Sequence, residues 1–194
     1  MQNEHLKIAT LFQSASQIQD LIDEADKDGE TKSLIQKFSE LKKTRLPFYL
    51  DEDEFDEILR WKLRGQYCRQ LKLRERNTEL FIISMTRSAF AVVNKAEAWE
   101  TEQRLRILVK LNGVGIPVAS AILTICYPDR YSVIDFRGWR QVFGQAKKYN
   151  NYSYKEYCEY LSEIKQIAFR FDLTPQEVDM AIWQYDKETN SKRN

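Results

Sequence analysis

The residues of this chain that could carry chemistry lie close together, between positions 111 and 140. Two glycines flank an apolar residue in Gly113-Val114-Gly115, and Pro117 follows where a new helix is expected to begin. Glycine permits positive φ angles and leaves backbone N–H groups uncovered. Beside the positive end of a helix dipole, such a turn predicts an anion site that suits a phosphate group. A plain turn between two helices is the alternative.

An aspartate, Asp135, stands 22 residues after Gly113. It is expected to follow an extended link over residues 131–134 and to cap a short helix over residues 136–143. A carboxylate in this place can accept hydrogen bonds from the start of the helix. It can also stabilise positive charge that develops on a substrate. The two roles are not exclusive, so both remain open for Asp135.

Four further residues are of a type that could belong to a site. Trp61 and Lys62 lie on an expected helix that could face the same region, with core packing and a surface charge as their alternatives. Arg140 could contact a phosphate or brace a buried carboxylate. His5, the only histidine, is expected to be an exposed residue of an N-terminal helix, which disfavours histidine-based catalysis.

The composition excludes several classes of protein. Only six glycines and four prolines occur in 194 residues, which favours helices over turns and short strands. The three cysteines are scattered and form no C-x-x-C pair, so neither a zinc site nor an iron–sulfur cluster is expected. No signal peptide and no apolar run of about 20 residues is visible, which indicates a cytoplasmic protein without a membrane span.

The charges are segregated although the net charge is only +1. Residues 51–57 carry six acids, and residues 60–76 carry seven bases and one acid. Such segregation can create a basic face on a neutral protein. Two helix faces that pair with each other are the alternative.

Hydrophobic spacing and breakers predict an all-α fold without strands. The expected helices cover residues 5–25, 32–43, 51–63, 78–95, 102–111 after a Thr101 cap, 117–126 and 136–143. Two more follow, one with an apolar stripe from Leu161 to Phe171 and one after a capping box at Thr174 and Glu177. Residues 1–45 are expected to be an N-terminal helical extension and residues 46–187 the main domain.

Residues 111–140 resemble the helix-hairpin-helix superfamily of base-excision DNA glycosylases, which includes endonuclease III, the adenine glycosylase and 8-oxoguanine glycosylase. The matching residues read Leu111-x-Gly113-Val114-Gly115-x-x-x-Ala119 and then Val133-Ile134-Asp135-Phe136-Arg137-Gly138-Trp139-Arg140. The match is close over about 35 residues and loose, by helix order, over about 140. The chain also looks like a short bacterial branch of that superfamily, on the basis of Trp61-Lys62 and Val178-Asp179-Met180-Ala181-Ile182-Trp183.

The resemblance implies a helix-hairpin-helix glycosylase-like fold and a monomeric enzyme that works on double-stranded DNA. It implies that Asp135 is catalytic and that Trp61 and Lys62 border the substrate pocket. The residues implied to bind DNA are Asn112, Gly113, Val114, Gly115, Pro117 and Arg140, with Val114 anchoring the hairpin in the core. No cofactor and no catalytic metal is implied, although a monovalent cation could occupy the hairpin. A cytoplasmic protein associated with the bacterial nucleoid is expected.

Three departures from the family pattern limit what can be carried over. Bifunctional members have a nucleophilic lysine two residues after the second glycine, where this chain has Pro117, so a monofunctional enzyme is implied. The iron–sulfur cysteines of endonuclease III are absent, and the segment before the hairpin is short, so base-reading residues cannot be assigned. A non-catalytic DNA-binding protein of the same fold, or a helical interaction protein with a coincidental Gly-Val-Gly, remain alternatives. The tyrosines could stack on bases, with a hydrated helix face as the favoured alternative; they are Tyr149, Tyr152, Tyr154, Tyr157 and Tyr160.

Overall fold

The computed structural model describes residues 11–147, 149 and 151–190, and all regular secondary structure in that part of the chain is helical. In chain order the elements are α1 (Ala15–Ala25), α2 (Glu30–Thr44), α3 (Glu52–Leu63), the 3₁₀ segment η2 (Arg64–Gln70), α4 (Leu71–Arg74), α5 (Glu79–Ala91), α6 (Glu97–Leu108), α7 (Ile116–Cys126), α8 (Phe136–Phe143), α9 (Tyr154–Phe171) and α10 (Pro175–Asn190). The expected all-α class is therefore confirmed.

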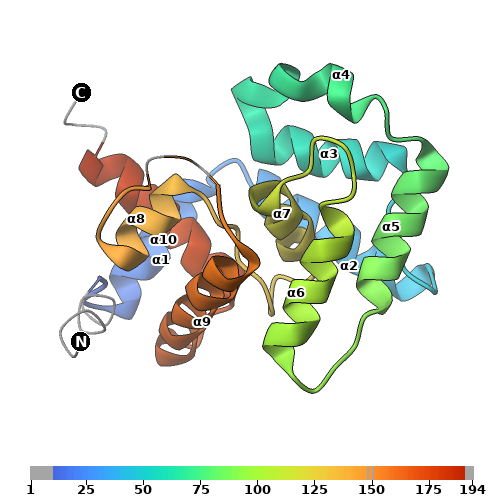
Figure 1. Cartoon of the computed structure of the whole chain (residues 1–194). Coiled ribbons are helices and arrows are strands. Elements are labelled where there is room, and N and C mark those ends of the chain that lie inside the picture. The colour runs from blue at the N-terminus through green and yellow to red at the C-terminus, as the bar shows by residue number, and fades with distance from the viewer. Residues whose placement is uncertain (1–10, 148, 150, 191–194) are drawn as a thin grey trace.

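The helices form two groups that lie side by side in Figure 1. The terminal group combines both ends of the chain, with α1, α8 and α9 packed around α10. The central group contains α2 to α7, in which α3 and α2 pack against α7 and α5 packs against α6. Helices α6 and α9 connect the two groups. Buried residues of both groups belong to one continuous hydrophobic core.

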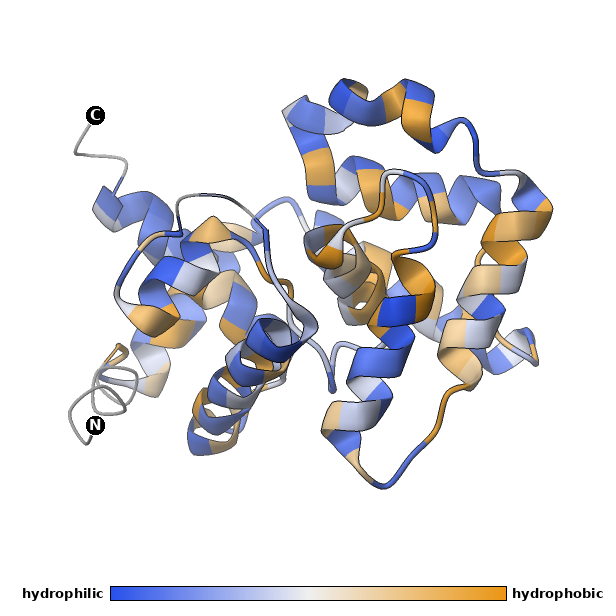
Figure 2. Ribbon diagram, in the orientation of Figure 1, coloured by the Kyte–Doolittle hydropathy of each residue, from blue (hydrophilic) through white to orange (hydrophobic). Residues whose placement is uncertain are grey.

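Helix α7 is the centre of the central group. All its residues except Pro117 are buried, as expected for a helix that is apolar nearly all round. In Figure 2, polar and apolar residues alternate along most of the other helices, which bury one face only. The residues directly before and directly after α7 are therefore attached to a helix that is fixed in the core.

Several helix starts agree with their local sequence signals. Asp51 and Glu54 form a capping box at α3, and Glu54 also binds Arg45. Thr174 and Glu177 form the hydrogen bonds of the capping box expected before α10. The predicted helix over residues 136–143 is confirmed as α8.

Two helices of the central group differ from expectation. Helix α5 ends at Ala91 instead of residue 95, and both Leu80 in its first turn and Val93 after its end are exposed. Helix α6 begins at Glu97, so Thr101 lies inside it and does not cap it. The cause is Glu100, whose carboxylate accepts a hydrogen bond from the Asn94 backbone at 2.8 Å and pairs with Arg104 within the helix, which stabilises an earlier start.

The N-terminal helices pack against the rest of the chain, α1 against α10 and α2 against α7. The ring of Phe12 contacts Tyr185 on α10, and the Lys42 ammonium group donates to the Cys126 carbonyl at the end of α7. Residues of the expected N-terminal extension thus lie against α10 and α7. The expected helix over residues 5–25 begins at Ala15 in the described part, because Ser14 caps it; its first six residues, His5 included, lie outside the described residues.

The acidic and basic runs pair with each other only in part. Arg60 binds Asp56 across the two runs. Two other acids of the first run have partners outside the basic run, since Glu57 pairs with Lys37 and Glu54 with Arg45. Within the described ranges, no helix combines the length and apolar character needed to cross a membrane.

Candidate functional site

The hairpin lies between the end of α6 at Leu108 and the start of α7 at Ile116. Of its two glycines only Gly113 adopts a positive φ, at 78°, whereas Gly115 is extended with φ −93° and ψ 179°. A Cβ atom on Gly113 would lie 2.6 Å from Cγ of Arg74, but on Gly115 its nearest neighbour would be Cδ of Pro117 at 3.8 Å. The fold therefore requires glycine at position 113. At position 115 a side chain would have room, and glycine leaves the surface of the hairpin uncovered.

An asparagine pair fixes the hairpin to the loop before α5. Asn77 Oδ1 accepts a hydrogen bond from the Asn112 backbone N–H at 2.8 Å, and Asn77 Nδ2 donates to the Asn112 carbonyl at 2.9 Å. Val114 is buried, which confirms the expected anchor in the core. Sequence reasoning missed both Asn77 and Arg74, because no local pattern links them to a turn 35 residues away.

The hairpin also carries backbone donors that no described protein group accepts. The N–H groups of Gly113, Gly115 and Ile116 have no protein acceptor among the described residues. Pro117 is the second residue of α7 rather than the first, and it has no N–H to offer. Uncovered N–H groups at a helix N-terminus can bind an anion such as a phosphate.

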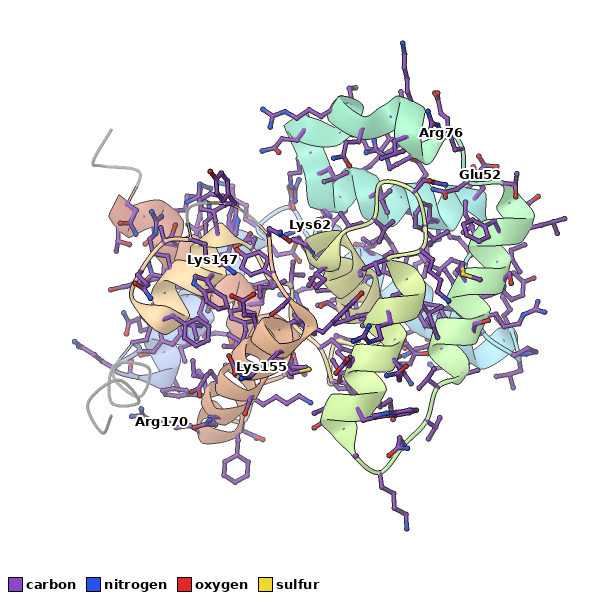
Figure 3. The ribbon with its side chains drawn as sticks, in the orientation of Figure 1. Glu52, Lys62, Arg76, Lys147, Lys155 and Arg170 are labelled. Carbon is purple, nitrogen blue, oxygen red and sulfur yellow. The ribbon has the colours of Figure 1, made fainter. Side chains whose placement is uncertain are left out.

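One carboxylate oxygen of Asp135 caps α8, and the other oxygen takes no part in the cap. Its Oδ1 atom accepts hydrogen bonds from the backbone N–H groups of Arg137 and Gly138, each at 2.9 Å. Its Oδ2 atom lies 3.7 Å from the ammonium nitrogen of Lys62, which stands between the two groups of helices in Figure 3. The side chains of Lys62 and Asp135 are 15 % and 19 % exposed, so the pair is largely buried yet open to solvent on one side.

The link before Asp135 is tied to both groups of helices. The Ile134 N–H donates to Oγ of Ser120 in α7 at 3.1 Å, and the Tyr157 hydroxyl of α9 donates to the Ser132 carbonyl at 2.9 Å. Ser120 lies one turn after Pro117, whose carbonyl accepts the Ser120 hydroxyl. The structure therefore places Asp135 beside the second helix of the hairpin.

The charge of Asp135 acts on a second carboxyl group, that of Asp179. Asp179 lies on α10, which packs against α8, the helix that Asp135 caps. Burial, followed by the negative charge of Asp135, holds the pKa of Asp179 well above its usual range, although Lys62 opposes the shift. Burial also raises the pKa of Tyr152, with Asp135 adding to the effect.

Arg140 binds a buried carboxylate instead of projecting freely toward a ligand. Its Nη2 atom lies 2.6 Å from Oδ2 of Asp186, a fully buried residue of α10 that also accepts hydrogen bonds from Arg137 and Gln141. Of the two roles open for Arg140, the structure shows the bracing one, and the Arg140 side chain remains 30 % exposed. Through these contacts α8 is fixed on α10.

Trp61 lies against the core, and three of the five candidate tyrosines are buried in it. Trp61 packs against the core and donates its indole N–H to Oγ1 of Thr31 in α2 at 3.2 Å, so it does not join the pair of Lys62 and Asp135. The expected hydrated face of tyrosines is wrong for Tyr152, Tyr157 and Tyr160, which are buried. The apolar stripe of α9 extends to Tyr157 and Tyr160, whereas Tyr152 lies just before the helix, and all three rings belong to the hydrophobic core.

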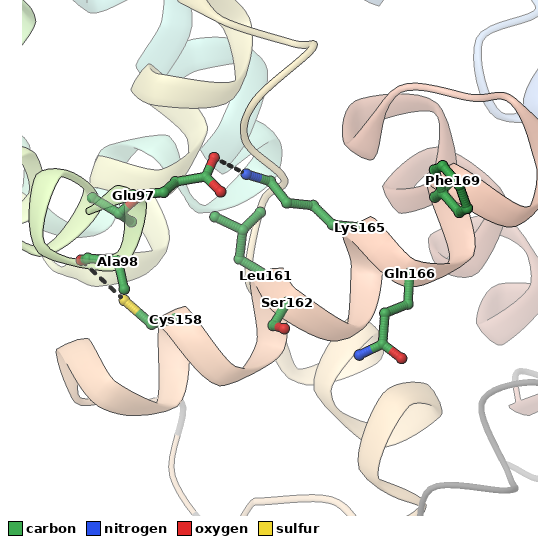
Figure 4. Close-up of a pocket in the computed structure, with 9 residues that line it drawn as sticks. Glu97, Ala98, Cys158, Leu161, Ser162, Lys165, Gln166 and Phe169 are labelled. Carbon is green, nitrogen blue, oxygen red and sulfur yellow. Dashed lines mark hydrogen bonds and ion pairs between the residues drawn. The ribbon is translucent and has the colours of Figure 1, made fainter. Parts of the chain in front are cut away.

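A shallow pocket of about 410 Å³ lies elsewhere, between the start of α6 and the middle of α9 (Figure 4). Its lining includes Phe169 and the ion pair of Glu97 with Lys165, but neither Lys62 nor Asp135. It is therefore distinct from the site around Asp135. No group of three or more metal-ligating side chains occurs in the part of the chain that the structure describes.

Comparison of the chain with models of known protein families, with curated proteins and with solved structures found no match.

Proposed function

We propose that this protein is a monofunctional DNA glycosylase that hydrolyses the bond between a damaged or modified base and its sugar. The main support for the proposal is the way in which the carboxylate of Asp135 is held. One of its oxygens is immobilised by two backbone N–H groups, and the other faces Lys62 beside the second hairpin helix. A capping role accounts for the first oxygen only.

The geometry suits a reaction that builds positive charge on a sugar. When the bond between C1′ and the base nitrogen breaks, its electron pair leaves with the base, and the sugar becomes cation-like. A fixed carboxylate stabilises that charge, and a water molecule adds to C1′ and gives a proton to Asp135. The base must first leave the duplex stack, which the hairpin would support by holding the adjacent phosphates.

The test of the proposal is release of free bases from a panel of duplexes that each contain one damaged or modified base. Release from at least one duplex, without strand cleavage, supports a monofunctional glycosylase. Binding of duplex DNA without release from any of them favours the second candidate, a non-catalytic DNA-binding protein. That candidate is supported by the cap that Asp135 forms at α8.

The hairpin is expected to bind DNA through its backbone, so a side chain at Gly115 should block it. Gly115→Val has room to fold, because only Pro117 lies within 4 Å of the added Cβ atom. Loss of charge-assisted hydrogen bonds should weaken binding by roughly 10- to 100-fold for all sequences alike. Fluorescence anisotropy with a labelled duplex at several salt concentrations measures the loss.

Gly113→Val provides the contrasting control. The positive φ of Gly113 and the contact with Arg74 predict a marked loss of thermal stability in this variant, which Gly115→Val should not show. If folded Gly115→Val bound duplex DNA as tightly as the parent, the hairpin would not be the DNA-binding element.

The glycosylase activity is expected to be monofunctional, because Pro117 replaces the lysine of bifunctional relatives and cannot form a Schiff base. Incubation of the active protein with its substrate and borohydride should therefore give no covalent adduct. An adduct on a denaturing gel would contradict this prediction. Lys62, whose amine lies 3.7 Å from Asp135, would then be the first suspect, and Lys62→Gln should abolish the adduct while Lys110→Gln should retain it.

A further inference from the structure

The segment between α3 and α5 forms a basic arm, residues 64–76, that connects the Asp135 site to the hairpin. The arm begins directly after Lys62, whose ammonium nitrogen lies 3.7 Å from Oδ2 of Asp135. It ends directly before Asn77, which is hydrogen-bonded to the backbone of the hairpin. In Figure 3, Lys62 lies between the two groups of helices and Arg76 marks the other end of the arm. Each end of the arm thus lies beside one part of the proposed DNA site.

One base of the arm points inward and fixes the arm against the hairpin. Arg74 is buried, donates a hydrogen bond to the Tyr67 carbonyl, and places its guanidinium carbon 4.5 Å from the centre of the Tyr67 ring. A Cβ atom built on Gly113 would lie 2.6 Å from Cγ of Arg74 and 3.7 Å from Oε1 of Gln70. The arm and the hairpin are therefore in direct contact, and the exposed bases of the arm take no part in that contact.

Three of the exposed bases gather around one hollow without a counter-charge. Arg64 pairs with Glu30 at 2.7 Å, but Arg69, Lys72 and Arg76 pair with no carboxylate among the described residues. All three line one open hollow of about 480 Å³, and no described acidic side chain lines it with them. Like charges three and four positions apart on a helical segment repel each other, so this arrangement does not stabilise the arm. A hydrated surface accounts for each charge alone, but a shared anionic partner accounts for their grouping.

We propose that the basic arm binds the sugar–phosphate backbone of duplex DNA through Arg69, Lys72 and Arg76, beside the phosphates that the hairpin would hold. The inference rests on the proposed function, but only on its DNA-binding part. Guanidinium and ammonium groups neutralise phosphates and release counterions, which gives affinity without reading the sequence. The uncovered donors of the hairpin are neutral N–H groups, so the arm adds the positive charge that those donors lack.

The test replaces Arg69, Lys72 and Arg76 together with glutamine and measures binding of a labelled duplex by fluorescence anisotropy, from about 50 to about 200 mM salt. Each lost phosphate contact lowers the slope of log affinity against log salt by about 0.9, so the triple variant should lower it by about 2 to 3. At the lowest salt concentration its affinity should fall roughly 10- to 100-fold for all duplexes alike, and the loss should shrink as the salt concentration rises. Each single glutamine variant should lower the slope by about 0.9, which gives the same test if the triple variant does not fold.

Two control variants separate the position of the charges from the net charge. Lys27→Gln, Lys95→Gln and Lys155→Gln together remove the same net charge from exposed positions outside the arm. Lys95 precedes α6, at the end of that helix away from the hairpin. This remote triple variant should keep nearly the slope of the parent. An exchange of arginine for lysine, and of lysine for arginine, at the three arm positions retains the charges and should also keep the slope.

The possible results distinguish this inference from the proposed function. An arm triple variant with the slope of the parent would overturn the inference, and so would a remote triple variant that loses as much slope. If the parent releases bases while the arm variant keeps its slope, the inference fails and the glycosylase function stands. If the arm variant loses the slope but no base is released from any duplex, the inference stands and the glycosylase reaction fails. Gly115→Val should weaken binding with little change in slope, because the donors it blocks are neutral.

Discussion

Asp135→Asn is expected to reduce base release by about 10³-fold, the scale on which fixed charges act in active sites. Asparagine is as good a helix cap as aspartate, so its Oδ1 atom can keep the bonds from Arg137 and Gly138. It cannot supply the negative charge that a cation-like sugar needs, nor can it pair with Lys62. Single-turnover assays on the substrate found in the duplex panel measure the loss.

Two comparisons separate catalysis from capping. Asp135→Asn should melt close to the parent and bind duplex DNA at least as well, because a carboxylate that repels phosphates is gone. Asp135→Ala, which lacks the cap, should in addition lose about 1 kcal/mol of stability. Full activity in folded Asp135→Asn would remove Asp135 from the mechanism and leave the DNA-binding protein as the better description.

Asp186→Ala should lower the free energy of unfolding by about 3–5 kcal/mol, as expected when one partner of a buried ion pair is removed. The Asp186 side chain is fully buried and joins α10 to α8 through Arg137, Arg140 and Gln141. Its removal leaves two guanidinium groups without their carboxylate. Because both are partly exposed and can recover some hydration, the lower half of this range is expected. Urea denaturation followed by circular dichroism measures the change.

The effect of pH provides an independent check on the Asp186 network. Burial acts to raise the pKa of Asp186, but the hydrogen bonds from Arg140, Gln141 and Arg137 outweigh it, and the net pKa is lowered. An acid with a lowered pKa stabilises the fold above its ordinary pKa and loses that contribution as the pH falls through the folded value. The parent should therefore lose stability below about pH 4 more steeply than Asp186→Ala. If Asp186→Ala were no less stable than the exposed control Asp20→Ala, the network would not stabilise the fold.

The sequence by itself determined the features that depend on residues a few positions apart. The bounds of α8, the capping role of Asp135 and the capping box at Thr174 were all readable, because each is made by a side chain and backbone groups within three residues. The hairpin was readable for the same reason, since Gly113 provides the positive φ and Val114 the anchor. Which of the two glycines takes the positive φ was not readable, because a glycine in sequence does not reveal its φ.

Only the tertiary structure decided which side chain lies near the carboxylate of Asp135 and which carboxylate pairs with Arg140. Lys62 reaches Asp135 from α3, and Arg140 binds Asp186 across 46 residues. A periodic pattern records which face of a helix is apolar, but not which helix covers it or which charges meet there. Ion pairs and hydrogen bonds between distant elements depend on the relative placement of whole helices, and that placement follows from the packing of the entire core.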